Sequence, residues 1–136
     1  MEGFAKICLH CFQSNLDLSC IHTAQSPRFI YEPPSFHGFS NSTGGSLTCS
    51  AHGLPTPRLT WVDGKEQPVR TVPGLRHVLE NGTLIFPPFP PQDYDSSIHE
   101  QEYRCVISNS AGTVVSRQAR VRAGMHMKKK IKSFTA

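Results

Sequence analysis

The most constraining feature of the sequence is the order and spacing of Cys49, Trp61, Tyr103 and Cys105. Trp61 is the only tryptophan and follows Cys49 by twelve residues, while Tyr103 precedes Cys105 by two. In one class of β-sandwich, cysteines on opposite sheets are bridged through the core and a tryptophan packs on the bridge. A tyrosine two residues before the second cysteine bonds its hydroxyl to nearby backbone. The pattern therefore predicts an all-β fold of two antiparallel sheets with a disulfide between Cys49 and Cys105.

Length and composition agree with a single β-domain that carries tails. The chain has 136 residues, and its 11 prolines and 10 glycines favour short strands and many turns over a helical bundle. No window of about 20 apolar residues occurs, so we expect no transmembrane segment in this chain.

The net charge of +4 is concentrated outside the predicted domain. Between residues 27 and 123, nine Lys/Arg stand against eight Asp/Glu. A nearly neutral domain argues against a nucleic-acid partner, and a short lysine-rich end is more often simply solvated. The four lysines of the C-terminal tail are Lys128, Lys129, Lys130 and Lys132.

No pattern in the sequence predicts catalysis or a cofactor. His99-Glu100 begins like a zinc-protease helix, but Tyr103 stands where the second histidine is required. A phosphate-binding glycine loop and a serine-nucleophile motif are both missing. We therefore expect that the chain is not an enzyme.

Residues 1–26 do not continue the strand pattern and are expected to be a leader or a disordered tail. Ala24-Gln25-Ser26 resembles a signal-peptide cleavage site, but Lys6 and Asp17 interrupt the apolar run before it. Cys8, Cys11 and Cys20 also lie here, and the sequence leaves their pairing open. Their spacing with the neighbouring histidines is too tight for a standard zinc knuckle, so we expect no metal.

Short alternating runs between proline and glycine turns predict strands throughout residues 27–123. The first strand should break at Pro33-Pro34, because a proline cannot donate to a ladder. Asn81-Gly82 is expected to form a two-residue hairpin turn. Residues 124–136 are expected to be a basic disordered tail. The predicted core consists of Leu47, Cys49, Leu59, Trp61, Leu84, Phe86, Tyr103, Cys105, Ile107, Val115 and Val121.

Two sequons make Asn41 and Asn81 candidate N-glycosylation sites. Asn41 precedes the Gly44-Gly45 turn, and Asn81 occupies the predicted hairpin tip. A hairpin tip is exposed, so a glycan at Asn81 is sterically compatible with the fold.

The cysteine, tryptophan and tyrosine frame resembles an I-set immunoglobulin domain. Finer motifs resemble the first immunoglobulin domain of a Down syndrome cell adhesion molecule (Dscam)-like receptor of invertebrate type. One departure from the general I-set pattern is His99, which stands where an aspartate is usual and indicates a longer corner before the strand of Cys105. The motifs that carry the likeness are residues 27–34, 39–44, 72–76, 84–89, 93–94 and 121–123.

The resemblance implies a fragment of a cell-surface receptor that mediates homophilic adhesion in neuronal wiring and axon guidance. Its location would be extracellular, at the plasma membrane, and its partners would be other cell-surface proteins and neighbouring immunoglobulin domains. Two alternatives stay open: a secreted arthropod-type immune-recognition domain, and an intracellular structural domain. The sequons and paired cysteines argue against the intracellular alternative, because cytosolic thiols stay reduced.

Overall fold

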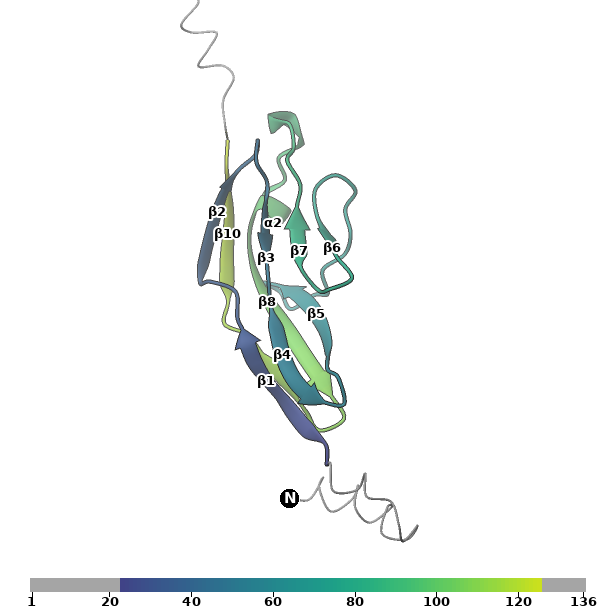
Figure 1. Ribbon diagram of the computed structural model, residues 1–136. Helices are drawn as coiled ribbons and strands as arrows, with labels where there is room; N and C mark the ends of the chain where they lie inside the picture. The colour runs from purple at the N-terminus through teal and green to yellow at the C-terminus, as the bar shows by residue number, and fades with distance from the viewer. Residues whose placement is uncertain (1–22, 126–136) are drawn as a thin grey trace, which may run out of the picture.

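A computed structural model describes residues 23–125 and shows a sandwich of short β-strands (Figure 1). The expectations for Cys8, Cys11 and Cys20 and for the lysine-rich tail lie outside the described residues. The strands are β1 (Gln25–Tyr31), β2 (Phe36–Ser40), β3 (Gly45–Leu47), β4 (Ser50–Leu54), β5 (Arg58–Asp63), β6 (His77–Val78), β7 (Leu84–Phe86), β8 (Glu100–Asn109), β9 (Gly112–Val115) and β10 (Ala119–Gly124). Two single turns of helix, η2 (Pro91–Asp93) and α2 (Ser96–His99), precede β8.

One layer of the sandwich contains two short ladders that follow one another along the same line. β1 pairs antiparallel with β4, and β3 pairs antiparallel with β7, which in turn pairs with β6. Cys49 lies between β3 and β4, at the point where the pairing partner of the chain changes from β7 to β1. β4 therefore has β1 as its ladder partner, whereas β3 has β7.

The second layer is a sheet in the order β2-β10-β8-β5, with β9 also paired to β8. β2 runs parallel to β10, and the other pairs are antiparallel. The chain passes from β1 in the first layer to β2 in the second through Pro33-Pro34. The predicted break of the first strand at these prolines is confirmed, as is the all-β sandwich.

The core lies between the two layers and contains most of the predicted residues. Tyr103, Cys105, Leu84 and Val121 are fully buried. Leu59 is only partly buried. The sequence prediction missed Phe89, Ile98, His99 and Ala119, which are also buried.

The prediction that Val115 points inward is wrong, because the last strand contains a bulge. Val115 pairs with Val106 and Ala119 pairs with Tyr103, so β9 and β10 advance four residues while β8 advances three. The extra residue reverses the alternation of side chains. Val114 consequently packs against the core, and the side chain of Val115 is 51% exposed.

The turn between β6 and β7 also differs from the prediction. The amide of Gly82 donates to the carbonyl of Leu79 over 2.9 Å, so the central residues are Glu80 and Asn81. Gly82 follows with φ of 93°, in the left-handed region that favours glycine. The loop therefore contains three residues, Glu80, Asn81 and Gly82, and has a glycine bulge. The two-residue Asn-Gly turn that was predicted is not formed.

The crossover between β7 and β8 is folded onto the end of the sandwich. Asp95 caps α2, because its carboxylate accepts from the amide of Ser97 over 2.9 Å. The ring of His99 stacks on Phe89, with centroids 3.9 Å apart. This packing closes the core above Tyr103 and gives the long corner its path.

Candidate interaction surface

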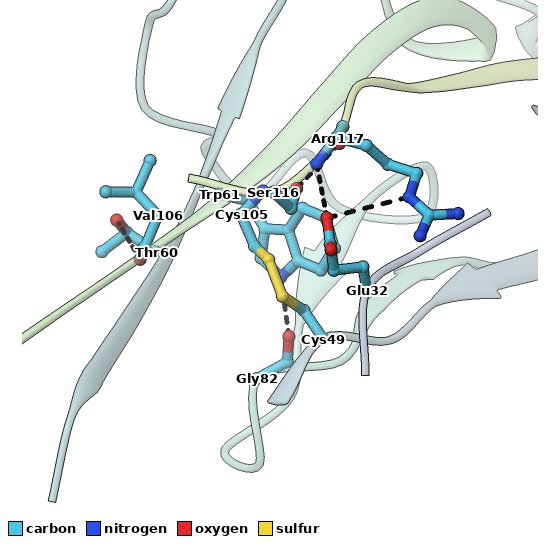
Figure 2. Close-up of a disulfide and its surroundings, with 9 residues drawn as sticks. All are labelled: Glu32, Cys49, Thr60, Trp61, Gly82, Cys105, Val106, Ser116 and Arg117. Atoms are coloured by element: carbon cyan, nitrogen blue, oxygen red, sulfur yellow. Dashed lines mark hydrogen bonds and ion pairs between the residues drawn. A yellow bond between two sulfur atoms is a disulfide. The ribbon is translucent and has the colours of Figure 1, made fainter. Parts of the chain in front are cut away.

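The predicted frame around the disulfide lies at the centre of the sandwich and serves the fold. Cys49 and Cys105 are bonded, with their Cα atoms 6.6 Å apart, and Trp61 pairs with Cys105 across β5 and β8 (Figure 2). The indole Nε1 donates a hydrogen bond of 2.6 Å to the carbonyl of Gly82. The predicted disulfide is thus confirmed, and the indole joins the sheet to the β6–β7 turn.

Tyr103 is anchored at its hydroxyl. Its Oη donates to the carbonyl of Ile98 over 2.8 Å and accepts from Nη1 of Arg76 over 3.2 Å. Burial raises the pKa of Tyr103, and the neighbouring Arg76 partly offsets that rise. The hydroxyl therefore stays protonated and can donate to the backbone at the end of α2.

A second set of contacts lies beside the disulfide. These contacts involve the bulge between β9 and β10 and the link between β1 and β2. Ser116, in the bulge, accepts from the amide of Cys105 at its Oγ over 2.9 Å. Glu32, in the link between β1 and β2, accepts from the amide of Arg117 over 2.8 Å and forms an ion pair of 3.7 Å with its guanidinium (Figure 2). The bulge residues Ser116 and Arg117 thus connect the β9–β10 segment to β8 and to the link between β1 and β2.

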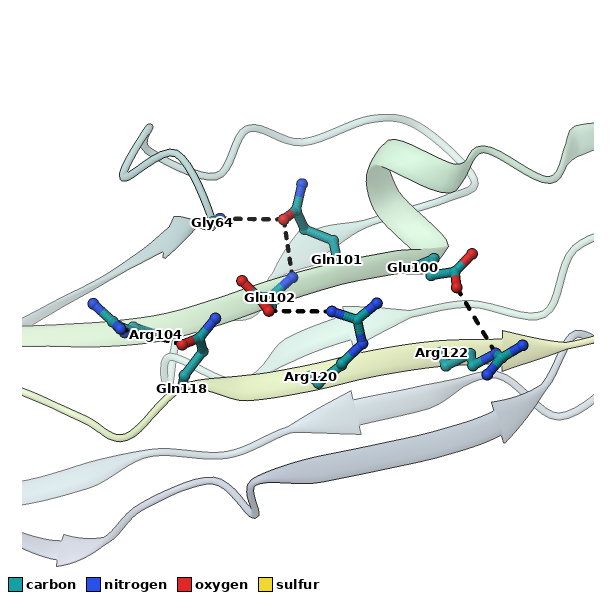
Figure 3. Close-up of polar contacts among 8 residues, drawn as sticks. All are labelled: Gly64, Glu100, Gln101, Glu102, Arg104, Gln118, Arg120 and Arg122. Carbon is teal, nitrogen blue, oxygen red and sulfur yellow. Dashed lines mark hydrogen bonds and ion pairs between the residues drawn. The ribbon is translucent and has the colours of Figure 1, made fainter.

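The outer face of the second sheet carries a ladder of opposite charges. Glu102 on β8 pairs with Arg120 on β10 over 3.1 Å, and Glu100 pairs with Arg122 over 3.9 Å (Figure 3). Arg104 continues the row by donating to Gln118 over 3.2 Å. The arginine side chains of the two ion pairs are 50% and 68% exposed, so these pairs add little stability and are accessible to a partner.

Apolar side chains border this charged ladder on two sides. Phe36 on β2 pairs with Arg120 and is 56% exposed, so it extends the ladder at the sheet edge. Val115, placed outward by the bulge, pairs with Val106 at the other border. A shallow hollow lies beside the ladder, lined by Asp63, Gly64, Glu66, Glu102, Arg104 and Gln118. This mixture of charged, polar and exposed apolar groups is compatible with a surface that binds protein.

The two sequons occupy different environments. Asn41 is buried, with 5% of its surface exposed, and its Nδ2 donates to the carbonyl of Phe89 over 2.9 Å. Asn81 lies in the exposed β6–β7 turn, where its Oδ1 accepts from the amide of Thr83 over 3.0 Å. A glycan is sterically compatible with this structure at Asn81 and is incompatible with it at Asn41.

The charged ladder could have been found in the sequence. Glu100, Glu102 and Arg104 alternate along one predicted strand, as do Arg120 and Arg122 along another. This period of two places all of them on the face opposite the core. The pairing between the strands carries no local signal, since it depends on the bulge.

Within residues 23–125, no three His, Cys, Asp or Glu side chains are grouped as metal ligands would be. In the same part of the chain, no helix has the length and apolar character needed to cross a membrane. The outer face of the second sheet, with its charged ladder and the exposed Phe36 and Val115, is a candidate surface for binding protein.

Two packed sheets, a first strand shared between them, and a disulfide covered by tryptophan define an I-set immunoglobulin-like domain. Relatives of known name identify the type. The sequence is 44% identical over 113 residues to "Cell adhesion molecule Dscam2" of Drosophila melanogaster, which covers 80% of this chain and 5% of that protein. It is 36% identical over 85 residues to human "Cell adhesion molecule DSCAM", covering 62% of this chain and 4% of that protein. The described domain is a Dscam-like immunoglobulin domain.

Solved structures give the same identification. The four N-terminal immunoglobulin domains of Dscam1 isoform 7.44 match with a TM-score of 0.75 at 39% identity, covering 76% of this chain and 27% of that one. The eight-domain structure of DSCAM isoform 1.30.30 matches with a TM-score of 0.74 at 40% identity, covering 76% of this chain and 15% of that one. No protein-family model matches the sequence. The chain spans about 5% of the length of the first relatives named here.

Proposed function

We propose that the chain supplies an extracellular recognition domain of a cell adhesion receptor and acts by binding protein, without catalysis. The observation that carries this proposal is the 44% identity to a protein named as a cell adhesion molecule, over 80% of this chain. Homophilic binding, with a role in neuronal wiring and axon guidance, is the form of adhesion that we propose.

The placement of the chain ends supports use as one unit in a row of domains. β1 begins at one end of the sandwich, and β10 ends at the opposite end (Figure 1). A domain of this kind can be joined to others end to end while both faces stay accessible. The solved Dscam1 relatives contain four such domains in one chain.

We propose the outer face of β2-β10-β8-β5 as the binding surface. The ladder of Glu100, Glu102, Arg120 and Arg122 carries both signs of charge, so two copies placed face to face can exchange ion-pair partners. Exposed Phe36 adds apolar area beside it. Charges at such a surface determine register and partner choice more than affinity.

The test is clustering of beads coated with the chain, produced behind an added signal peptide and with its disulfide verified. The double exchange Glu102→Arg with Arg120→Glu keeps an ion pair within the domain but inverts the pattern that a partner meets. A matched control, Arg28→Glu with Glu80→Arg, makes the same charge changes at exposed positions of the first layer. We expect the wild type and the control to cluster and the exchange variant to fail.

Beads that never cluster, although the protein is folded and bridged, contradict homophilic binding by this domain. Equal clustering of the exchange variant and the wild type contradicts the choice of surface and leaves homophilic binding standing. A mixed assay of exchange-variant beads with wild-type beads checks whether the exchanged charge pattern is itself the cause of any lost clustering.

A further inference from the structure

The turn that carries Asn81 has a defined five-residue geometry, Leu79 to Thr83. The amide of Leu79 donates to the carbonyl of Thr83 over 2.9 Å, which closes the loop at its base. The amide of Gly82 donates to the carbonyl of Leu79 over 2.9 Å, and Gly82 adopts a φ of 93°. Asn81 is held from its oxygen side, because Oδ1 accepts from the amide of Thr83.

Leu79 and Thr83 lie on the outside of this hairpin. Val78 pairs with Leu84, which is fully buried, so this pair lies on the inner face of the hairpin, although Val78, on the edge strand, is itself 40% exposed. Side chains alternate along a strand, so the next pair, Leu79 with Thr83, faces outward. Leu79 is 43% exposed, an apolar side chain two residues before Asn81 on the surface of the turn.

We propose that Asn81 carries an N-linked glycan whose first N-acetylglucosamine packs on the side chain of Leu79 and the methyl group of Thr83. The inference rests on the proposed extracellular function, since the sugar is added during export. Nδ2 of Asn81 forms a bond to C1 of the sugar, while the bond from C1 to a lipid diphosphate donor breaks and the amide gives up a proton.

The chemistry of the sugar suits this surface. A pyranose ring presents C–H groups on one face, and covering Leu79 with that face removes apolar area from water. The hydroxyl groups on the rim stay solvated. The sugar therefore acts as a further cross-strand contact over a hairpin whose strands contain only two and three residues.

The contact also bears on the core. The carbonyl of Gly82, within the same turn, accepts the hydrogen bond of Trp61 over 2.6 Å. A sugar that holds Leu79 and Thr83 together limits opening of the turn and protects that bond. Glycosylation at Asn81 thus becomes part of the folded structure.

The experiment uses the full chain secreted behind an added signal peptide and trimmed to a single N-acetylglucosamine with an endoglycosidase. Its Tm is compared with the Tm of the unglycosylated variant Asn81→Gln. The same comparison is made in a second background that carries Leu79→Ser. Val78→Ser is the matched control, because Val78 is also partly exposed but faces the other side of the hairpin. Thr83→Ser keeps the sequon and removes only the methyl group.

We expect the sugar to raise Tm by up to about 4–8 °C, the size of a strong cross-strand contact in a domain of this length. The rise should shrink with Leu79→Ser and with Thr83→Ser and persist with Val78→Ser. An equal rise in all backgrounds, or a secreted protein without a glycan at Asn81, overturns the proposal. Because the signal is supplied, failure of bead clustering leaves this result unaffected, so the two proposals can fail separately.

Discussion

The indole nitrogen of Trp61 donates a 2.6 Å hydrogen bond to the carbonyl oxygen of Gly82, which lies in a turn of the opposite layer. This bond crosses the sandwich beside the disulfide. It joins β5 to the β6–β7 turn. No ladder of backbone hydrogen bonds connects these two elements, because they belong to different sheets.

Trp61→Phe should therefore destabilise the domain beyond the loss of apolar volume. The buried Gly82 carbonyl loses its indole donor, and an unpaired buried carbonyl costs about 1–3 kcal/mol. Denaturant titration measures the free energy of unfolding. Thr60→Val, at an exposed position on the same strand, is the control and should change that energy by less than about 0.5 kcal/mol. A Trp61→Phe loss as small as the control's contradicts the role of the bond.

Replacing both cysteines, Cys49→Ala with Cys105→Ala, should lower the free energy of unfolding by about 2–5 kcal/mol. The bridge joins residues separated by 56 positions, so its loss frees a long loop in the unfolded chain. Reductant should produce a similar change in the wild type and none in the double variant. Unfolding midpoints with and without reductant check this, and an unchanged wild-type midpoint would count against a stabilising bridge.

Tyr103→Phe should destabilise the domain by about 1–3 kcal/mol, because the carbonyl of Ile98 and the guanidinium of Arg76 both lose a buried partner. Tyr94→Phe removes a hydroxyl from the surface, where it bonds to Glu100 over 3.1 Å, and serves as the control. Equal effects of the two substitutions would show that the buried hydroxyl has no special role.

Stability should fall below neutral pH through His99. Burial lowers the pKa of His99, only partly opposed by Asp95, while the charge of Arg76 lowers it further. Between the folded-state pKa and the ordinary value of about 6.5, the unfolded chain binds a proton that the folded chain excludes. The free energy of unfolding is therefore highest above about pH 6.5 and falls as pH decreases through that window.

His99→Gln removes the titrating ring and should flatten this dependence between about pH 7 and 5, a window above the range of ordinary carboxylates. Unfolding titrations at several pH values measure the slope. A slope that is the same in His99→Gln and the wild type assigns the pH dependence to other groups.

Asn41 should carry no glycan in folded, secreted protein, since its Nδ2 donates to Phe89 inside the structure. Thr43→Ala destroys that sequon without changing Asn41, and the mass of the secreted protein should not shift by a glycan. Thr83→Ala is the counterpart at Asn81 and should abolish glycan addition there. Mass analysis after deglycosylation in heavy-oxygen water identifies the occupied site, and a label at Asn41 in bridged protein contradicts the expectation.

The sequence predicted the central strands because their signals are local. Tyr103 and Cys105 alternate with the polar residues Glu102 and Arg104, and the prolines at 33 and 34 end the first strand by chemistry alone. Other features depended on pairing between strands and on packing between segments. Val115 was placed inward by the alternation of one continuous last strand, but the bulge between β9 and β10 turns it outward.

The path of the corner before β8 could not be predicted, although its greater length was expected from the position of His99. His99 is a polar residue in a polar stretch, and its burial arises from stacking on Phe89, which belongs to another segment. The charged ladder was visible as two alternating rows, but their meeting required the register of Arg120 opposite Glu102. Local patterns thus determine the faces of strands, while packing between segments determines which faces meet.

The parallel pairing of β2 with β10 has a mechanical consequence. In the adhesion role proposed above, the domain would be stretched from its ends, and the ends of β1 and β10 lie at opposite poles (Figure 1). Tension then slides β2 and β10 past each other along their lengths, so their hydrogen bonds are loaded together in shear and cannot open one after another. If that ladder yields, the segment between Cys49 and Cys105 still cannot extend, and the disulfide sets the limit of elongation.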